Sequence, residues 1–178
     1  MKKIYLTTFL AFLTLFSCTT TFARNKGITG LWQARDQHSD KPESLVVIYK
    51  YEGKYYGRML ATYDEQGNIK DTITEKKEKA PGVVGSPPYC GMDFIYDLEK
   101  EKGTKHGHTV YRGKIVDPEK GKTYTVEIWR DKKNLVVRGE LFIFGKNILW
   151  PRASEKDLPK GFSMNEVNHF VPKIPQTK

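Results

Sequence analysis

The sequence contains too few cysteines for a fold held together by disulfides. Of the two cysteines, Cys18 lies near the N-terminus and Cys90 stands alone in the body of the chain. A lone thiol cannot form a bridge within the mature protein, so the fold must depend on its core even in an oxidising compartment. The simplest interpretation of Cys90 is a small, half-buried apolar residue; an intermolecular bridge and a reactive thiol are the alternatives.

Long apolar runs are also scarce. The one candidate, residues 4–16, is shorter than the roughly 20 residues that a membrane-spanning helix needs. It follows Lys2 and Lys3 and precedes small residues spaced for cleavage after Ala23, which is the layout of a secretory signal peptide. We therefore assign residues 1–23 as a signal peptide, and we expect a periplasmic or secreted protein without a transmembrane segment.

Cys18 leaves a second route of export open. The residues before it partly resemble a lipoprotein signal, in which the cysteine is lipidated and becomes the first residue. Bulky Phe16, next to the small residue that precedes the cysteine, is a poor match to such a signal. Cleavage after Ala23 is therefore favoured over a lipid anchor at Cys18, and both routes lead out of the cytoplasm.

Blocks of like charge are absent. The formal net charge is +9, from 30 basic and 21 acidic residues, and removal of Lys2 and Lys3 leaves 28 against 21, or +7. The charges are mixed along the chain, as in residues 75–79 and 99–102, which is typical of solvated loops. The excess of positive charge favours anionic partners only weakly, and without a basic helix we expect no nucleic-acid partner.

Catalytic motifs are missing as well. The sequence has no nucleophile elbow, no His-Glu-x-x-His, no phosphate loop and no dinucleotide fingerprint. Asp97, Glu99 and Asp117 fall at predicted strand ends, where acidic residues are common in turns. His106 and His108 have the spacing that places two imidazoles on one side of a strand, but a metal site needs three or four ligands. We therefore predict no enzyme activity, no metal site and no cofactor.

Alternation of apolar and polar residues is what the sequence has in abundance. A period of two predicts β-strands, and the short turns between them predict an antiparallel meander. Closure into a barrel removes the exposed edges of such a meander, so we expect an all-β, up-and-down antiparallel barrel of about eight strands in residues 24–153. The expected strands are residues 29–35, 45–51, 55–63, 92–98, 108–116, 122–130, 135–144 and 148–152.

Two segments lack this alternation. Residues 68–91 contain several prolines, which cannot donate to a strand ladder, and are expected to form a long loop that is functional or mobile. Residues 154–178 are polar and contain prolines, and we expect this C-terminal tail to be loosely attached.

Several motifs together carry a resemblance to a known family. Gly30-x-Trp32 lies near the start, an Asp-Pro-x-x-Gly-Lys-x-Tyr block begins at Asp117, and Val-Arg-Gly and Trp-x-Arg, ending at Gly139 and Arg152, follow. In this order they resemble the bacterial family catalogued as domain of unknown function 2147, over roughly residues 27–153. The resemblance implies a small exported protein with a lipocalin-like barrel and no established reaction. The family tends to carry paired cysteines in the central region, where this sequence has one.

The two ends of the barrel sequence are expected to meet. Gly30-x-Trp32 is similar to the lipocalin signature, in which a tryptophan of the first strand plugs one end of the barrel and an arginine of the last strand packs over it. Arg152 is the candidate arginine. The pair Trp32–Arg152 would then be structural, with a cation–π contact of about 0.5–2 kcal/mol.

Two predicted strands carry arginine among apolar residues on one face. Tyr56 and Arg58 share a face of one strand, and Arg138 and Phe142 share a face of a later strand. If these faces point inward, the arginines would hold an anionic group of a ligand whose apolar body packs on aromatic side chains, Trp150 among them. If they point outward, the charges are solvated.

The leading hypothesis is therefore an exported, lipocalin-like binding protein that holds a small hydrophobic or anionic ligand inside the barrel. An eight-stranded barrel leaves room for side chains or for one small ligand. The alternative is an interaction protein with a filled barrel, which binds an envelope component or another protein through its outer surface or residues 68–91. The sequence leaves the ligand and the oligomeric state open.

Overall fold

The computed structural model of the protein describes residues 27–105, 107–139 and 146–178. The assigned signal peptide, Cys18, His106 and Phe142 lie outside these residues, and what the sequence predicts for them stays a prediction.

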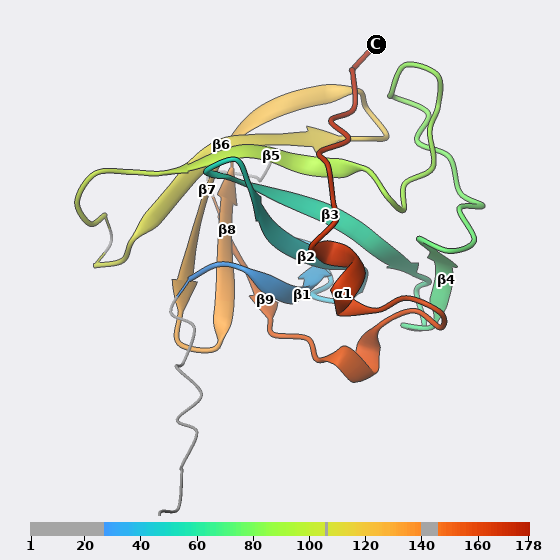
Figure 1. The fold of residues 1–178 in the computed structure, drawn as a ribbon, viewed down its shortest axis with the longest axis horizontal. Helices are drawn as coiled ribbons and strands as arrows, with labels where there is room; N and C mark the ends of the chain where they lie inside the picture. Colours follow the sequence, from blue (N-terminus) through green and yellow to red (C-terminus); the bar gives the residue numbers. More distant parts are fainter. Residues whose placement is uncertain (1–26, 106, 140–145) are drawn as a thin grey trace, which may run out of the picture.

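Within the described part of the chain, nine strands form one antiparallel sheet that curls into a barrel (Figure 1). Eight of them follow one another in chain order, and β4 pairs with β3 at the side. This confirms the predicted all-β, up-and-down barrel. The strands are β1 (Gly30–Arg35), β2 (Pro42–Tyr51), β3 (Lys54–Tyr63), β4 (Ile69–Thr72), β5 (Asp93–Lys100), β6 (Val110–Asp117), β7 (Lys122–Asp131), β8 (Asn134–Gly139) and β9 (Asn147–Pro151).

The barrel closes where β1 meets the end of β9. Trp32 and Arg152 form an antiparallel bridge, and the backbone N–H of Ala153 donates to the carbonyl oxygen of Leu31 at 3.0 Å. These contacts give the edges of both strands a partner, which removes the unpaired backbone groups that an open sheet would expose.

Trp32 fills one end of the barrel. Its side chain is fully buried, and its indole N–H donates to the carbonyl oxygen of Ile28 at 2.8 Å. The guanidinium of Arg152 lies over the ring, 4.8 Å from its centroid, so the contact expected between the two residues is present. Gly30 makes room for this guanidinium, because a Cβ at that position would collide with it.

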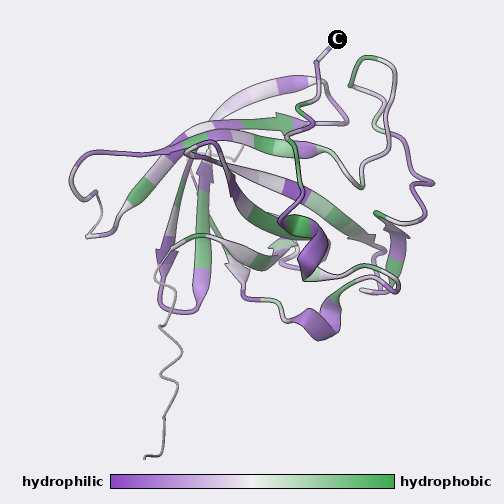
Figure 2. Ribbon diagram, in the orientation of Figure 1, coloured by the Kyte–Doolittle hydropathy of each residue, from purple (hydrophilic) through white to green (hydrophobic). Residues whose placement is uncertain are grey.

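Alternate residues of each strand face the interior, as a period of two requires. On β2, Val46 and Ile48 belong to the core inside the barrel, whereas Leu45 and Val47 belong to a second apolar cluster on the outer face. Figure 2 shows that the strands carry both hydrophobic and hydrophilic stretches. Both faces of β2 are therefore buried, and something must cover the outer one.

The C-terminal tail supplies this cover. Residues 154–178, which the sequence suggested would be loosely attached, contain two short helices, η2 (Glu155–Asp157) and α1 (Met164–Val167), and cross the outer face of the first strands. Phe162 is 8% exposed and packs in the outer cluster with Leu45 and Val47. The expectation of a loose tail is corrected, because its apolar residues complete this cluster.

A buried ion pair fastens the tail. Arg58 Nη2 lies 2.6 Å from Asp93 Oδ2, and the two side chains are 4% and 0% exposed. The same Nη2 donates to the carbonyl oxygen of Val171 at 2.7 Å, and the guanidinium lies 4.0 Å from the ring centroid of Phe170. The hydroxyl of Tyr49 donates to Asp93 Oδ1 at 2.9 Å. Arg58 thus joins β3, β5 and the tail.

The segment between β4 and β5 is ordered against the barrel. Ala80, Val83 and Cys90 are buried and belong to the interior core. The N–H of Gly82 donates to the carbonyl oxygen of Pro118 at 3.0 Å, which ties the segment to the turn between β6 and β7. Residues 68–91, expected to be one long loop, therefore contain a strand and a packed cover for one end of the barrel.

Removing the charge of Asp93 is expected to destabilise the protein strongly. Asp93→Asn leaves the Arg58 guanidinium buried without its counter-ion, which costs about 3–5 kcal/mol of the free energy of unfolding. The matched control is Lys54→Gln, which breaks the ion pairs of Lys54 with Asp97 and Glu99 and should change the free energy of unfolding little, because these side chains are 41–65% exposed and solvent screens their charges. Urea unfolding of both variants measures the difference, and equal losses would contradict a fastening role for the buried pair.

Candidate functional site

A cavity opens at the end of the barrel away from Trp32. It lies where β1 ends, β2 begins and β6 turns into β7, and its volume is about 460 Å³. This volume falls within the range of protein sites for small molecules. The cavity is lined below by interior core side chains and above by residues of the loops at this end.

The floor of the cavity is apolar and aromatic. Trp150 of β9 is 4% exposed, and its ring centroid lies 6.5 Å from that of Phe94 on β5. Met59 of β3 and Ile115 of β6 add flexible and branched side chains to the same floor. Side chains from β3, β5, β6 and β9 therefore combine into a surface that suits an apolar ligand body.

The rim is charged, with acidic residues in the majority. Five carboxylates and three cations line the cavity, so their formal sum is −2. The carboxylates are Asp36, Glu43, Glu78, Asp117 and Glu119, and the cations are Arg35, Lys70 and Lys120.

Each rim cation already has a carboxylate partner. Lys70 Nζ lies 2.5 Å from Glu78 Oε1, and Lys120 Nζ lies 3.4 Å from Asp117 Oδ2. Arg35 Nη1 lies 3.8 Å from Asp40 Oδ2, a carboxylate outside the cavity. In the described residues no cation pairs with Glu43, Glu119 or Asp36, and Asp36 instead accepts hydrogen bonds from the backbone of its own turn.

Two titratable groups respond to this excess of negative charge. The pKa of Glu43 is raised, first because surrounding protein displaces water from a carboxylate that still reaches solvent, and then because Asp36, Glu119 and Asp117 repel its charge. Burial raises the pKa of Tyr89 to about 12, with further contributions from the carboxylates of Glu119, Glu78 and Asp117. Both shifts have the sign expected next to anionic neighbours.

Three buried polar atoms of the cavity lining lack hydrogen-bond partners in the described part of the protein. They are Arg35 Nε, Gln37 Oε1 and the indole nitrogen of Trp150. An unsatisfied buried donor or acceptor costs about 1–3 kcal/mol, so native proteins seldom leave one without water or a ligand. All of the orphaned atoms that the described residues contain belong to residues around this one cavity.

The structure places the sequence-predicted ligand residues unevenly. Trp150 lines the cavity. Tyr56 and Arg58 do not: Arg58 pairs across strands with Val47, whose side chain is in the outer cluster, and it lies under the tail. Phe142 falls outside the described residues.

Arg138 also faces outward. It pairs across strands with Glu127 and lies on the same face of β8 as Val136, a member of a small cluster separate from the interior core, whereas Val137 faces the interior. The inward orientation considered for Arg58 and Arg138 is corrected, and with it goes the basis for an anionic group held inside the barrel by these arginines. The alternation along each strand shows which residues share a face, but it does not show whether that face points into the barrel or out of it.

Sequence reasoning missed the rim residues of the cavity. Arg35, Gln37 and Glu43 lie at or next to the turn between β1 and β2, and Glu119 lies in the turn between β6 and β7. In an up-and-down barrel alternate turns share one end, so the predicted strand order already contained the signal. Collecting the charges of alternate turns would have exposed the acidic rim.

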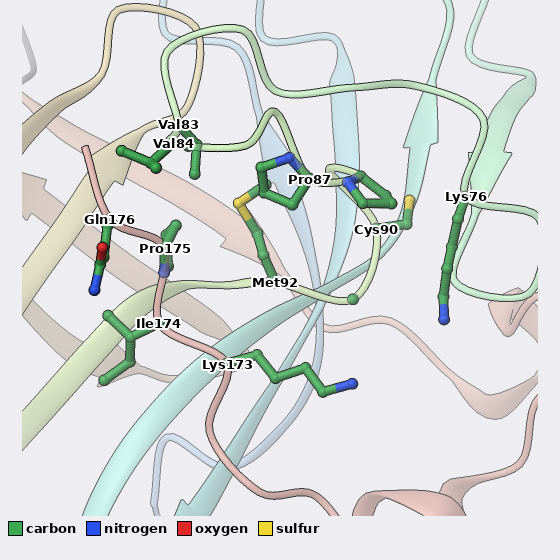
Figure 3. Close-up of a pocket in the computed structure, with 12 residues that line it drawn as sticks. Lys76, Val83, Val84, Pro87, Cys90, Met92, Lys173, Ile174, Pro175 and Gln176 are labelled. Carbon is green, nitrogen blue, oxygen red and sulfur yellow. The ribbon is translucent and has the colours of Figure 1, made fainter. Parts of the chain in front are cut away.

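A second, shallower hollow lies outside the barrel, between residues 76–92 and the tail (Figure 3). Its volume is about 390 Å³, and Cys90 is in its wall. Burial, with the carboxylates of Asp71 and Glu78, raises the pKa of the Cys90 thiol to about 12. The thiol is therefore protonated at neutral pH and suits packing, not nucleophilic chemistry.

In the part of the chain that the structure describes, no group of three or more His, Cys, Asp or Glu side chains is arranged to hold a metal ion. The described residues also contain no helix with the length and apolar character needed to cross a membrane.

A closed antiparallel barrel, plugged at one end by a tryptophan under an arginine and hollow at the other, defines a lipocalin-like protein. The chain belongs to the bacterial family described as "Uncharacterized protein conserved in bacteria (DUF2147)", whose family model matches residues 30–152. This confirms the resemblance carried by the sequence motifs.

A solved structure supports the same fold. The chain is similar to protein HP1028 from Helicobacter pylori, described as belonging to the lipocalin family, with a TM-score of 0.56 and 22% sequence identity. The match covers 79% of this chain and 95% of that one, and at this identity it shows the fold alone. Among curated proteins no match is found.

The raised pKa of Cys90 predicts an unreactive thiol in the native protein. A shift of the pKa from the ordinary value of 9.0 to about 12 lowers the thiolate fraction at pH 8 by about a thousandfold. Because only the thiolate is the nucleophile, the reactivity of the thiol falls with that fraction. Iodoacetamide at pH 8, followed by peptide mass spectrometry, should leave Cys90 unmodified in the native state and alkylate it in 8 M urea. Rapid alkylation of the native protein would contradict the burial of this side chain.

Proposed function

We propose that the protein is an exported binding protein that holds a small, partly apolar ligand in the cavity at the end of its barrel away from Trp32. The observation that carries the proposal is the gathering of orphaned buried polar atoms, on Arg35, Gln37 and Trp150, around one cavity with an apolar floor. Apolar lining with a few convergent polar groups is the usual character of a small-molecule site.

The mechanism is burial without chemistry. The apolar body of the ligand would pack against Trp150, Phe94 and Met59, and each methylene removed from water contributes about 0.8 kcal/mol. Polar atoms of the ligand would then meet the indole N–H of Trp150 and the amide oxygen of Gln37, which otherwise lack partners among the described residues. A ligand that satisfies them gains affinity and orientation together.

The alternative is an interaction protein that uses its outer surface. Val84 and Ile174 are 53% and 43% exposed, and both line the hollow between residues 76–92 and the tail (Figure 3). These two apolar side chains are what favours this alternative. This alternative requires no ligand inside the barrel. Variants that change only the barrel cavity or only the outer hollow therefore distinguish the two functions.

Filling the cavity should abolish ligand binding. Ala34 is buried in the cavity wall, and Ala34→Phe places a ring in the space that a ligand would occupy. The neutral fluorescent probe N-phenyl-1-naphthylamine should bind the unmodified protein, and its affinity should fall by about tenfold or more in the variant. Val84→Phe adds the same ring to the outer hollow and should leave probe binding unchanged.

Circular dichroism and urea unfolding establish that each variant is folded. If Ala34→Phe does not fold, Ser44→Phe fills the same cavity from β2. No probe binding by the unmodified protein, or equal binding by a folded cavity variant, would falsify the proposed site. Loss of binding in Val84→Phe alone would instead support the outer surface.

Export is part of the proposal and has its own measurement. The basic start, the short apolar run and the small residues before Arg24 support cleavage after Ala23. Intact-mass analysis of the protein from the envelope and medium fractions of its native host should therefore find a chain that begins at Arg24. A chain that begins at a lipidated Cys18 would support export by the alternative route, whereas a cytoplasmic chain that retains residues 1–23 would exclude export.

A further inference from the structure

We infer that the ligand of the barrel cavity is a cationic amphiphile, with an apolar body and one positively charged end such as a protonated amine. This inference rests on the proposed function, since it names the chemical class of the molecule held in the same cavity. It is argued from the pairing of charges at the rim, from the contrast between the rim and the whole protein, and from the orphaned donor in the floor.

The pairing of charges leaves carboxylates, not cations, available at the rim. Lys70, Lys120 and Arg35 are each within 4 Å of a carboxylate partner. Glu43 and Glu119 have no cation partner in the described residues, although both line the cavity. A positive group entering the mouth would therefore meet unpaired negative charge, and a negative group would meet repulsion.

The local sign is opposite to that of the protein as a whole. The full chain carries a formal net charge of +9, whereas the cavity lining sums to −2. A surface patch drawn at random from a basic protein would be positive on average. Acidic residues in and beside the β1–β2 and β6–β7 turns converge here with Glu78, so the fold itself gathers the negative charge at one opening.

The floor of the cavity gives an independent sign of an occupant. Trp150 is 4% exposed and lines the cavity, and its indole nitrogen is buried without an acceptor in the described residues. This donor indicates that a ligand reaches the floor of the cavity, but it does not indicate the sign of the ligand's charge. A ligand long enough to reach Trp150 from the rim would place its apolar body over the floor and its charged end among the carboxylates.

Arg35 does not reverse the argument. Its Nη1 donates to the carbonyl oxygen of Asp40 at 2.7 Å, and its Nη2 donates to Gln33 Oε1 at 2.9 Å. The side chain is thus held by the turn between β1 and β2, and only its Nε lacks a partner in the described residues. An anion at this single N–H would stand beside Glu43 and Asp36 on the same rim.

Three probes with one apolar body test the sign of the charge. Octylammonium, octan-1-ol and octanoate carry charges of +1, 0 and −1 at pH 7, and each can displace N-phenyl-1-naphthylamine from the full-length mature protein. Octylammonium should bind about three- to tenfold more tightly than octan-1-ol, and octanoate should bind most weakly. Non-specific attraction to a basic protein would give the reverse order, so it cannot produce the expected one.

Single substitutions at the rim locate the preference. Glu43→Gln and Glu119→Gln should each weaken octylammonium by about threefold and leave octan-1-ol unchanged, and added salt should reduce the effect. Glu52→Gln is the control, because it removes the same charge from the turn between β2 and β3 at the other end of the barrel. It should leave all three affinities unchanged.

The outcomes distinguish this inference from the proposed function. If none of the probes binds, the cavity is not a ligand site and the proposed function fails. If all three bind equally, or octanoate binds most tightly, ligand binding stands and the cationic preference is overturned. Equal weakening by Glu52→Gln and Glu43→Gln would also overturn it, because the preference would then come from overall charge.

Discussion

The closure of β1 onto β9 around Trp32 is the constraint on which the rest of the molecule depends. With Trp32 buried and covered by Arg152, one end of the barrel is filled, and the cavity with the aromatic floor lies toward the other end. Gly30 is part of this closure, because any side chain there would displace the guanidinium of Arg152. Local sterics at one end thus decide where the molecule has space.

Burial of both faces of β2 explains why the tail is structured. Its central residues form an unbroken apolar run, which is typical of a strand covered on two sides and not of a strand with one face in water. The run is visible in the sequence, but nothing in it indicates that residues 154–178 supply the cover. Arg58 belongs to this second, outer layer, since the ion pair with Asp93 and the bond to Val171 hold the cover in place.

How much of the molecule could be predicted from the sequence differs from feature to feature for physical reasons. The period of two gave the strands, and the motifs at Trp32 and Arg152 gave the closure, because both are local patterns. The face on which Arg58 and Arg138 lie could not be read in the same way, since a strand with apolar residues on both sides offers no inward direction. The rim of the cavity required combining turns far apart in sequence.

The contrast between the two kinds of carboxylate in the structure carries the functional argument further. Asp93 is fully buried and bound to Arg58 and Tyr49, so its charge stabilises the fold. Glu43 reaches solvent beside a cavity, has a raised pKa and forms no ion pair in the described residues. A carboxylate held among other carboxylates costs stability. A positively charged ligand bound at the rim would offset the repulsion among these carboxylates, which explains why the cavity keeps them together.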